Sequence, residues 1–111
     1  MIKQEFYYAK VGDILINFKL QAEENKKKII KKEVKNFKKY CIKEFKNNIK
    51  RGINITKVCL SIYVTYEFQE EISEIVLSEL TKEYENISFS FFYDGFMNTY
   101  KSLKMVAKDI K

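Results

Sequence analysis

The stretch that decides the fold is residues 26–51, KKKIIKKEVKNFKKYCIKEFKNNIKR. Its apolar residues recur at steps of three and four, which is the spacing of one face of an α-helix. This apolar stripe consists of Ile30, Val34, Phe37, Cys41, Phe45 and Ile49. Gly52 follows two cations, Lys50 and Arg51, and this arrangement is typical of a helix C-terminus. The pattern predicts a long amphipathic helix over residues 22–51.

The same stretch is strongly basic, with twelve basic residues and only two acidic ones, Glu33 and Glu44. Seven of its lysines repeat at helical steps on a line opposite the apolar stripe: Lys28, Lys32, Lys35, Lys39, Lys43, Lys46 and Lys50. At 1.5 Å per residue this lysine line is about 33 Å long. Like charges at this spacing destabilise a helix by roughly 0.2–0.5 kcal/mol per pair, so the line is slightly unfavourable for folding.

Residues 2–21 allow two interpretations. Their apolar residues alternate with more polar ones, which is typical of half-buried strands, and Gly12 suits a turn. This favours a hairpin of strands 2–9 and 14–21, which we expect. The competing interpretation makes residues 11–20 the start of a long helix, with one face formed by Val11, Leu15, Phe18 and Ala22.

The remaining chain predicts four further features. Residues 56–66, TKVCLSIYVTY, alternate between two faces and predict a strand, and residues 87–93, ISFSFFY, predict another. Between them, residues 68–85 have the spacing of an amphipathic helix. Asp94 suits the N-cap of a final helix. The apolar residues of this helix would be Phe96, Tyr100, Leu103, Ala107 and Ile110.

The predicted order is therefore ββαβαβα. It indicates one α+β domain over residues 1–111, a two-layer sandwich with helices on one face of a small mixed sheet. The unit at 56–93 would be a right-handed βαβ crossover if its strands are parallel neighbours. Phe37, Ile62 and Phe89 each lie in the middle of a predicted element on its apolar face, so we expect all three in the core.

Composition argues against most catalytic and metal sites. The chain has no histidine, and its two cysteines, Cys41 and Cys59, lie far apart in the sequence. We therefore expect no zinc site, no Ser-His or Cys-His nucleophile, no catalytic residue, no cofactor and no enzymatic activity. No run of about 18 apolar residues and no signal-peptide pattern is present, so we expect a cytoplasmic protein without membrane contact.

The charge balance indicates an anionic partner. The formal net charge is +6, and Arg51 is the only arginine among 21 basic residues. Lysine neutralises phosphate, whereas the bidentate reading of guanine belongs to arginine. The leading hypothesis is a small accessory protein that binds DNA or RNA through the lysine line with weak sequence specificity. The composition is typical of AT-rich codons, so the protein would suit a phage or other mobile element of an AT-rich bacterium, and this bias also accounts for part of the lysine.

The alternative is a protein–protein interaction module, such as an inhibitor or an assembly factor. Residues 67–85 carry seven glutamates and one lysine and would form an acidic helix beside the basic one. The flanks of the two helices would exchange ion pairs, while the lysine line points away. A second candidate surface is the outer sheet face, where Tyr63 and Phe92 would support self-association as a homodimer.

Overall fold

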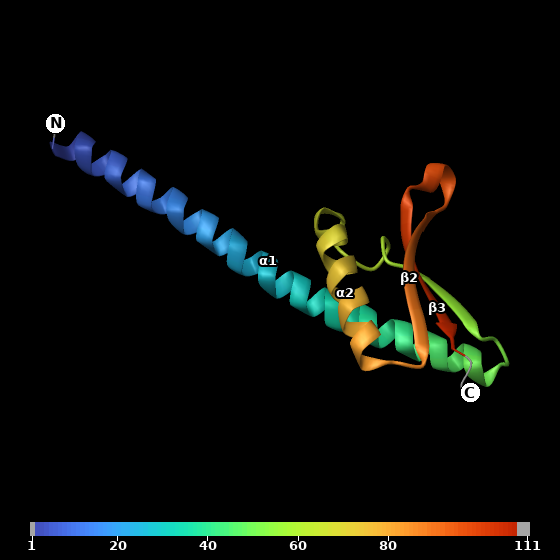
Figure 1. Ribbon diagram of the computed structural model, residues 1–111. Coiled ribbons are helices and arrows are strands. Elements are labelled where there is room, and N and C mark those ends of the chain that lie inside the picture. The colour runs from blue at the N-terminus through green and yellow to red at the C-terminus, as the bar shows by residue number, and fades with distance from the viewer. Residues whose placement is uncertain (1, 109–111) are drawn as a thin grey trace.

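The computed structural model describes the backbone of residues 2–108 and the side chains of residues 17–108 (Figure 1). Its helices and strands are α1 (Ile2–Lys50), β1 (Ile55–Cys59), α2 (Gln69–Glu83), β2 (Ile87–Asp94) and β3 (Tyr100–Ala107). Short 3-10 turns precede α2 at Tyr66–Phe68 and follow β2 at Phe96–Asn98. The C-terminal half of α1 lies against the other elements, and its N-terminal half extends beyond them.

The predicted N-terminal hairpin is wrong, because residues 2–21 belong to α1. Alternation over so few residues fits a strand and a helix equally well. The chain contains no proline, and a single glycine, Gly12, costs only about 1 kcal/mol inside a helix. Once the stretch that follows is helical, each further residue adds a backbone hydrogen bond without a new nucleation cost. The competing interpretation, with residues 11–20 helical, is the correct one.

The C-terminus of α1 lies where the sequence predicts it. Gly52 has a φ of +80°, which a glycine adopts without strain. Its N–H donates to the carbonyl of Ile49 at 3.0 Å, and the N–H of Ile53 donates to the carbonyl of Asn48 at 2.8 Å. This pair of bonds is a Schellman motif, and it satisfies carbonyls that the end of a helix leaves without partners.

The sheet has three strands in the order β1-β3-β2, and both pairings are antiparallel. β1 and β2 are therefore parallel to each other but are separated by β3, so β1, α2 and β2 form a split βαβ unit. The predicted order ββαβαβα and the mixed sheet with adjacent strands in the 56–93 unit are wrong. The broader α+β class is consistent with the structure.

β3 occupies the place of the predicted final helix. The apolar residues of this segment fit the alternation of a strand as closely as they fit helical spacing. Leu103 and Met105 are fully buried, whereas Lys104 and Val106 are only partly covered. As a strand, the segment forms backbone hydrogen bonds with both β1 and β2, which a helix at this place would not form. These long-range bonds outweigh the local helical pattern. Ile110, the last residue of the predicted helix, lies outside the described residues.

The turn between β2 and β3 explains why no helix starts there. Gly95 has a φ of +80°, and Met97 and Asn98 also have positive φ values, so the chain reverses. Asp94 is the last residue of β2 and not a helix cap. Its carboxylate accepts a hydrogen bond from the Ser102 hydroxyl at 3.0 Å.

β1 is shorter than the predicted strand 56–66, because it ends at Cys59. Just beyond that point, the backbone N–H of Lys101 in β3 bonds to a side chain and not to a backbone carbonyl. It donates to the Ser61 hydroxyl oxygen at 2.9 Å. The chain then turns, which leaves Ile62 67 % exposed. The prediction that Ile62 lies in the core is therefore wrong.

A single core lies between the two helices and one face of the sheet. Phe37, from the middle of the apolar stripe, is 2 % exposed as predicted, and Phe89 packs against the core from β2. Burial raises the pKa of the Cys41 thiol to about 12, so this thiol stays protonated at neutral pH. The largest fully buried side chains are Leu60, Ile72, Val76, Leu80, Leu103 and Met105.

Candidate functional site

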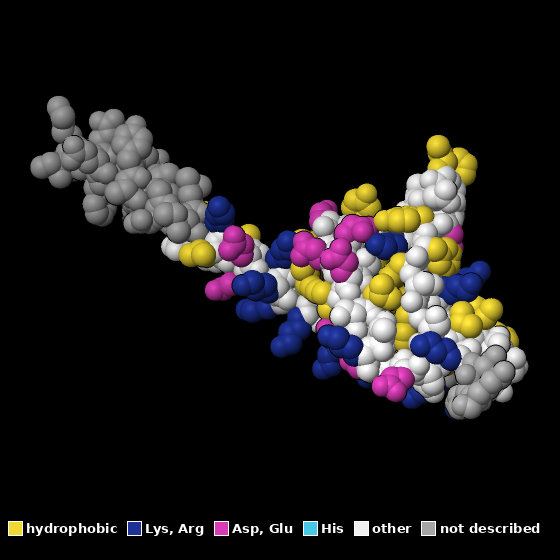
Figure 2. Space-filling view, in the orientation of Figure 1, with side chains coloured by type: hydrophobic (Ala, Val, Ile, Leu, Met, Phe, Trp, Pro, Cys, Tyr) yellow, Lys and Arg dark blue, Asp and Glu magenta, His cyan; other side chains and the backbone are white. Residues whose placement is uncertain are grey.

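All seven side chains of the lysine line are exposed on α1. The opposite face of the helix is held in the core by Val34, Phe37, Cys41 and Phe45, which fixes the rotation of the helix about its axis. The ion pairs that the structure shows among residues 17–108 do not include any member of the line. Figure 2 shows basic side chains along this helix and acidic side chains gathered over α2.

α2 neutralises other lysines, on the flank of α1. The Lys26 ammonium lies 2.7 Å from a Glu71 carboxylate oxygen. Lys38 bridges two carboxylates, at 2.8 Å from Glu79 and 2.6 Å from Glu83. Burial lowers the pKa of Lys38, but the hydrogen bonds and charges of Glu79 and Glu83 outweigh this effect and raise it. The acidic helix therefore compensates the flank of α1 and leaves the outward line uncompensated.

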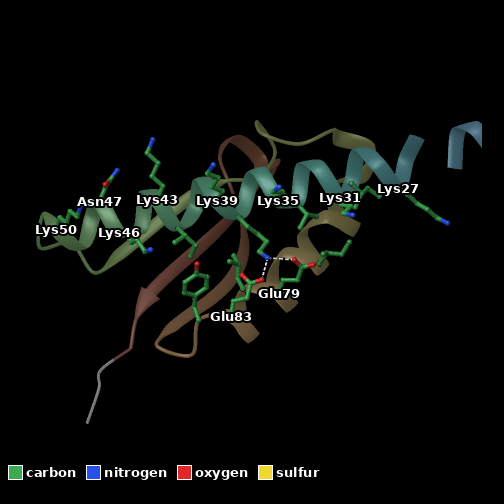
Figure 3. A pocket seen from close by; sticks show the side chains of 17 residues that line it. Lys27, Lys31, Lys35, Lys39, Lys43, Lys46, Asn47, Lys50, Glu79 and Glu83 are labelled. Carbon is green, nitrogen blue, oxygen red and sulfur yellow. Dashed lines mark hydrogen bonds and ion pairs between the residues drawn. The ribbon is translucent and has the colours of Figure 1, made fainter. Parts of the chain in front are cut away.

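A groove of about 1010 Å³ runs along α1 on the side of α2 (Figure 3). Eight lysines line it: Lys27, Lys31, Lys35, Lys38, Lys39, Lys43, Lys46 and Lys50. Its apolar lining consists of Ile30, Val34, Ile42, Ile75, Leu80 and Tyr84. Five of the eight lysines belong to the lysine line, while Lys28 and Lys32 lie outside the groove. Asn47, Glu79 and Glu83 complete the lining, and the two carboxylates are ion-paired with Lys38. The groove thus joins a lysine-rich rim on α1 to an apolar floor.

One of the two acidic residues in the basic stretch has a structural role. The Glu33 carboxylate accepts hydrogen bonds from the Thr65 backbone N–H at 2.9 Å and from the Thr65 hydroxyl at 2.7 Å. It thereby ties α1 to the loop that leads into α2 and sets how the two helices meet at the groove. The sequence gives no local sign of this bond, because the two residues are 32 positions apart.

A second polar cluster holds the β2–β3 hairpin against α2. The buried Lys101 ammonium lies 2.8 Å from the Glu70 carboxylate and 2.9 Å from the Ser73 hydroxyl. The Tyr93 hydroxyl donates to the same carboxylate at 2.7 Å. A serine beside a lysine is a nucleophile–base arrangement in some enzymes. Here Ser73 is only 2 % exposed and Lys101 is ion-paired, so the cluster is structural.

The hydrogen bonds from Lys101 and Tyr93 lower the pKa of Glu70. A carboxylate with a lowered folded pKa stabilises the protein above its unfolded pKa, and this stabilisation is lost as the pH falls through the folded value. Glu70→Gln should therefore lose less free energy of unfolding than the unmodified protein between about pH 7 and about pH 3, measured by urea denaturation. Glu74→Gln removes an exposed carboxylate from the same helix and should retain the unmodified pH dependence. An unchanged acid slope in Glu70→Gln would contradict this assignment.

The two residues predicted for self-association lie in different parts of the fold. Phe92 lies on the outer sheet face, where the Lys57 ammonium is 5.7 Å from its ring centroid. Tyr63 lies in the turn after β1, and its ring centroid is 4.7 Å from that of Tyr40 on α1. The prediction that both lie on the outer sheet face is therefore wrong for Tyr63.

Two further properties of the described chain bear on its class. Among the described residues, no helix combines the length and the apolar character needed to cross a membrane. In the same part of the chain, no three side chains of the metal-ligating types come together. Comparison of the sequence and structure with protein-family models, curated proteins and solved structures finds no match.

Proposed function

We propose that this protein is a small non-enzymatic accessory protein that binds DNA or RNA through the lysine line. The line offers seven cations on one helix over about 33 Å, at steps of three or four residues. Phosphate backbones are neutralised by such point charges, and the release of condensed counterions drives association. Binding of this kind places the protein on the nucleic acid without reading much of its sequence.

One observation supports this proposal above the others. α2 pairs its glutamates with Lys26 and Lys38 and leaves the outward lysines without a partner among the described residues. Repulsion between the aligned lysines lowers the stability of the helix, and an anion that binds along the line would offset this loss. The single arginine, Arg51, lies beyond the helix end and donates to the Asn48 side chain at 3.1 Å, which favours weak sequence specificity.

The protein–protein alternative has less support at the acidic helix. Four of the seven glutamates in residues 67–85 form ion pairs within the protein: Glu70, Glu71, Glu79 and Glu83. A basic partner that binds this helix would have to break these pairs or use the glutamates that remain. The outer sheet face around Phe92 is the other candidate contact, and light scattering that reports a dimer would favour it.

The proposal is tested by fluorescence anisotropy with labelled DNA and RNA oligonucleotides. We expect binding to all sequences at about 50 mM salt, and a loss of roughly a thousandfold in affinity at about 200 mM if six or more phosphates are contacted. Comparable affinities for unrelated sequences would agree with binding through phosphates. Absence of binding to DNA and RNA at the lower salt concentration would overturn the proposal.

A further inference from the structure

We infer that the site takes a single strand, whose phosphates follow the lysine line while its unpaired bases enter the groove between α1 and α2. This inference rests on the proposed function and adds the form of nucleic acid that is bound. It draws on two observations, the straightness of the line and the apolar floor beside it.

The first observation concerns shape. The lysines lie on one straight helix face about 33 Å long, and one turn of duplex DNA rises by about 34–36 Å. Over that length each duplex strand winds once around the axis, so a straight line of cations follows it over only part of a turn. A single strand is flexible and can extend beside all seven lysines. Contact with all seven lysines is therefore easier for a single strand than for a duplex.

The second observation concerns the groove. Its rim includes five lysines of the line, from Lys35 to Lys50, so a strand held at the rim has its bases beside the groove. The floor between these lysines and α2 is mainly aliphatic. In a duplex the base faces are covered by their neighbours, whereas unpaired bases can place a face on an apolar surface and leave water. Of the two forms of nucleic acid, only a strand with unpaired bases can therefore gain affinity from this floor.

Tyr84 provides one aromatic surface for such a base. Its half-buried side chain lines the groove, and its ring centroid is 6.4 Å from that of Phe89, which supports it from β2. Stacking of a base on an aromatic ring typically raises affinity by about five- to a hundredfold and tolerates any base. This agrees with a site that has little capacity to read sequence.

The experiment uses Tyr84→Trp. The chain has no tryptophan, so this variant carries a single tryptophan, at the groove, which can be excited at wavelengths where the tyrosines do not absorb. A single strand of about 12 nucleotides should quench its emission by stacking, and the same sequence as a duplex should not. Phe96→Trp is the matched control, because Phe96 is 82 % exposed on the β2–β3 turn away from α1, and neither ligand should quench it.

Anisotropy with the unmodified protein gives a second measurement that does not depend on folding of the variant. We expect the single strand to bind at least about tenfold more tightly than the duplex at equal salt. Equal or tighter duplex binding would overturn this inference and leave the proposed function intact. Absence of binding by both ligands would overturn both. Quenching of the Tyr84→Trp reporter by an acidic amphipathic peptide but by no oligonucleotide would assign the groove to a protein partner and overturn the inference.

Discussion

Phe37→Ala is expected to lower the free energy of unfolding by about 3–5 kcal/mol. The Phe37 ring is 2 % exposed at the centre of the apolar stripe, where α1 meets the core. Its loss removes apolar burial and leaves a cavity between elements that Glu33, Lys38 and the sheet hold at a fixed separation. Such a site has little freedom to collapse, so the cost should lie in the upper part of the range for core substitutions.

The matched control for this substitution is Ile62→Ala. From strand alternation alone, Ile62 would lie in the core as Phe37 does, but its side chain is 67 % exposed. Its truncation should change the free energy of unfolding by less than about 0.5 kcal/mol. Equilibrium urea denaturation of both variants measures the difference. A loss below about 1 kcal/mol in Phe37→Ala would contradict the position of α1 against the sheet.

The second large effect is expected on binding. We consider a fourfold variant that keeps helix propensity and removes four charges from the lysine line: Lys35→Gln, Lys39→Gln, Lys43→Gln and Lys46→Gln. Affinity should fall by at least about a hundredfold at about 50 mM salt for every sequence. The slope of log affinity against log salt should shrink by about 0.7 per lost contact with a single strand and about 0.9 with a duplex. Stability should stay equal or rise slightly, because repulsion along the helix is relieved.

A fourfold control separates the lysine line from net charge. It removes the same number of charges from lysines outside α1: Lys57→Gln, Lys82→Gln, Lys104→Gln and Lys108→Gln. If the line is the binding surface, this control should retain most of the affinity and most of the salt slope. Equal losses in the two variants would show that binding follows overall charge and not the arrangement on α1.

In the parts of the fold that the sequence predicts correctly, the apolar residues repeat with a single spacing and the ends of the elements are clearly marked. The apolar stripe from Ile30 to Phe45 allows only a helix, and Gly52 ends it. α2 and β2 agree with their predicted ranges to within two residues at either end. In these segments the local pattern and the tertiary structure require the same conformation, so local reasoning is sufficient.

In the segments that are predicted wrongly, the apolar residues fit the spacing of a strand and that of a helix at once. Residues 2–21 and 100–107 each fit a strand and a helix, so the local pattern does not decide between them. Residues 2–21 continue the helix that the following stretch has already nucleated. For residues 100–107 the deciding contacts are the backbone bonds to β1 and β2, whose partners lie far away in sequence. The same holds for Ile62, because the turn that exposes it depends on a hydrogen bond between Ser61 and Lys101.

The candidate site also has one part that the sequence predicts and one part that it does not. The lysine line is visible in the sequence, because steps of three and four along one helix fix which residues share a face. The groove is not visible, because its floor combines Ile42 of α1 with Ile75 of α2 and with Tyr84, the residue that follows α2. The angle between these helices depends on bonds such as that of Glu33 to Thr65, which no local pattern announces.

The central place of β3 has a consequence for synthesis on the ribosome. Of the three strands of this sheet, β3 is translated last, yet both ladders need it, and β1 and β2 are not paired with each other. A nascent chain that ends before Tyr100 can form its helices but has two strands with unpaired edges and no Leu103 or Met105 to close the core. Such edges favour aggregation and proteolysis. We therefore expect the sheet to form only after translation has passed residue 107, and a chain that terminates before Tyr100 to leave no stable product.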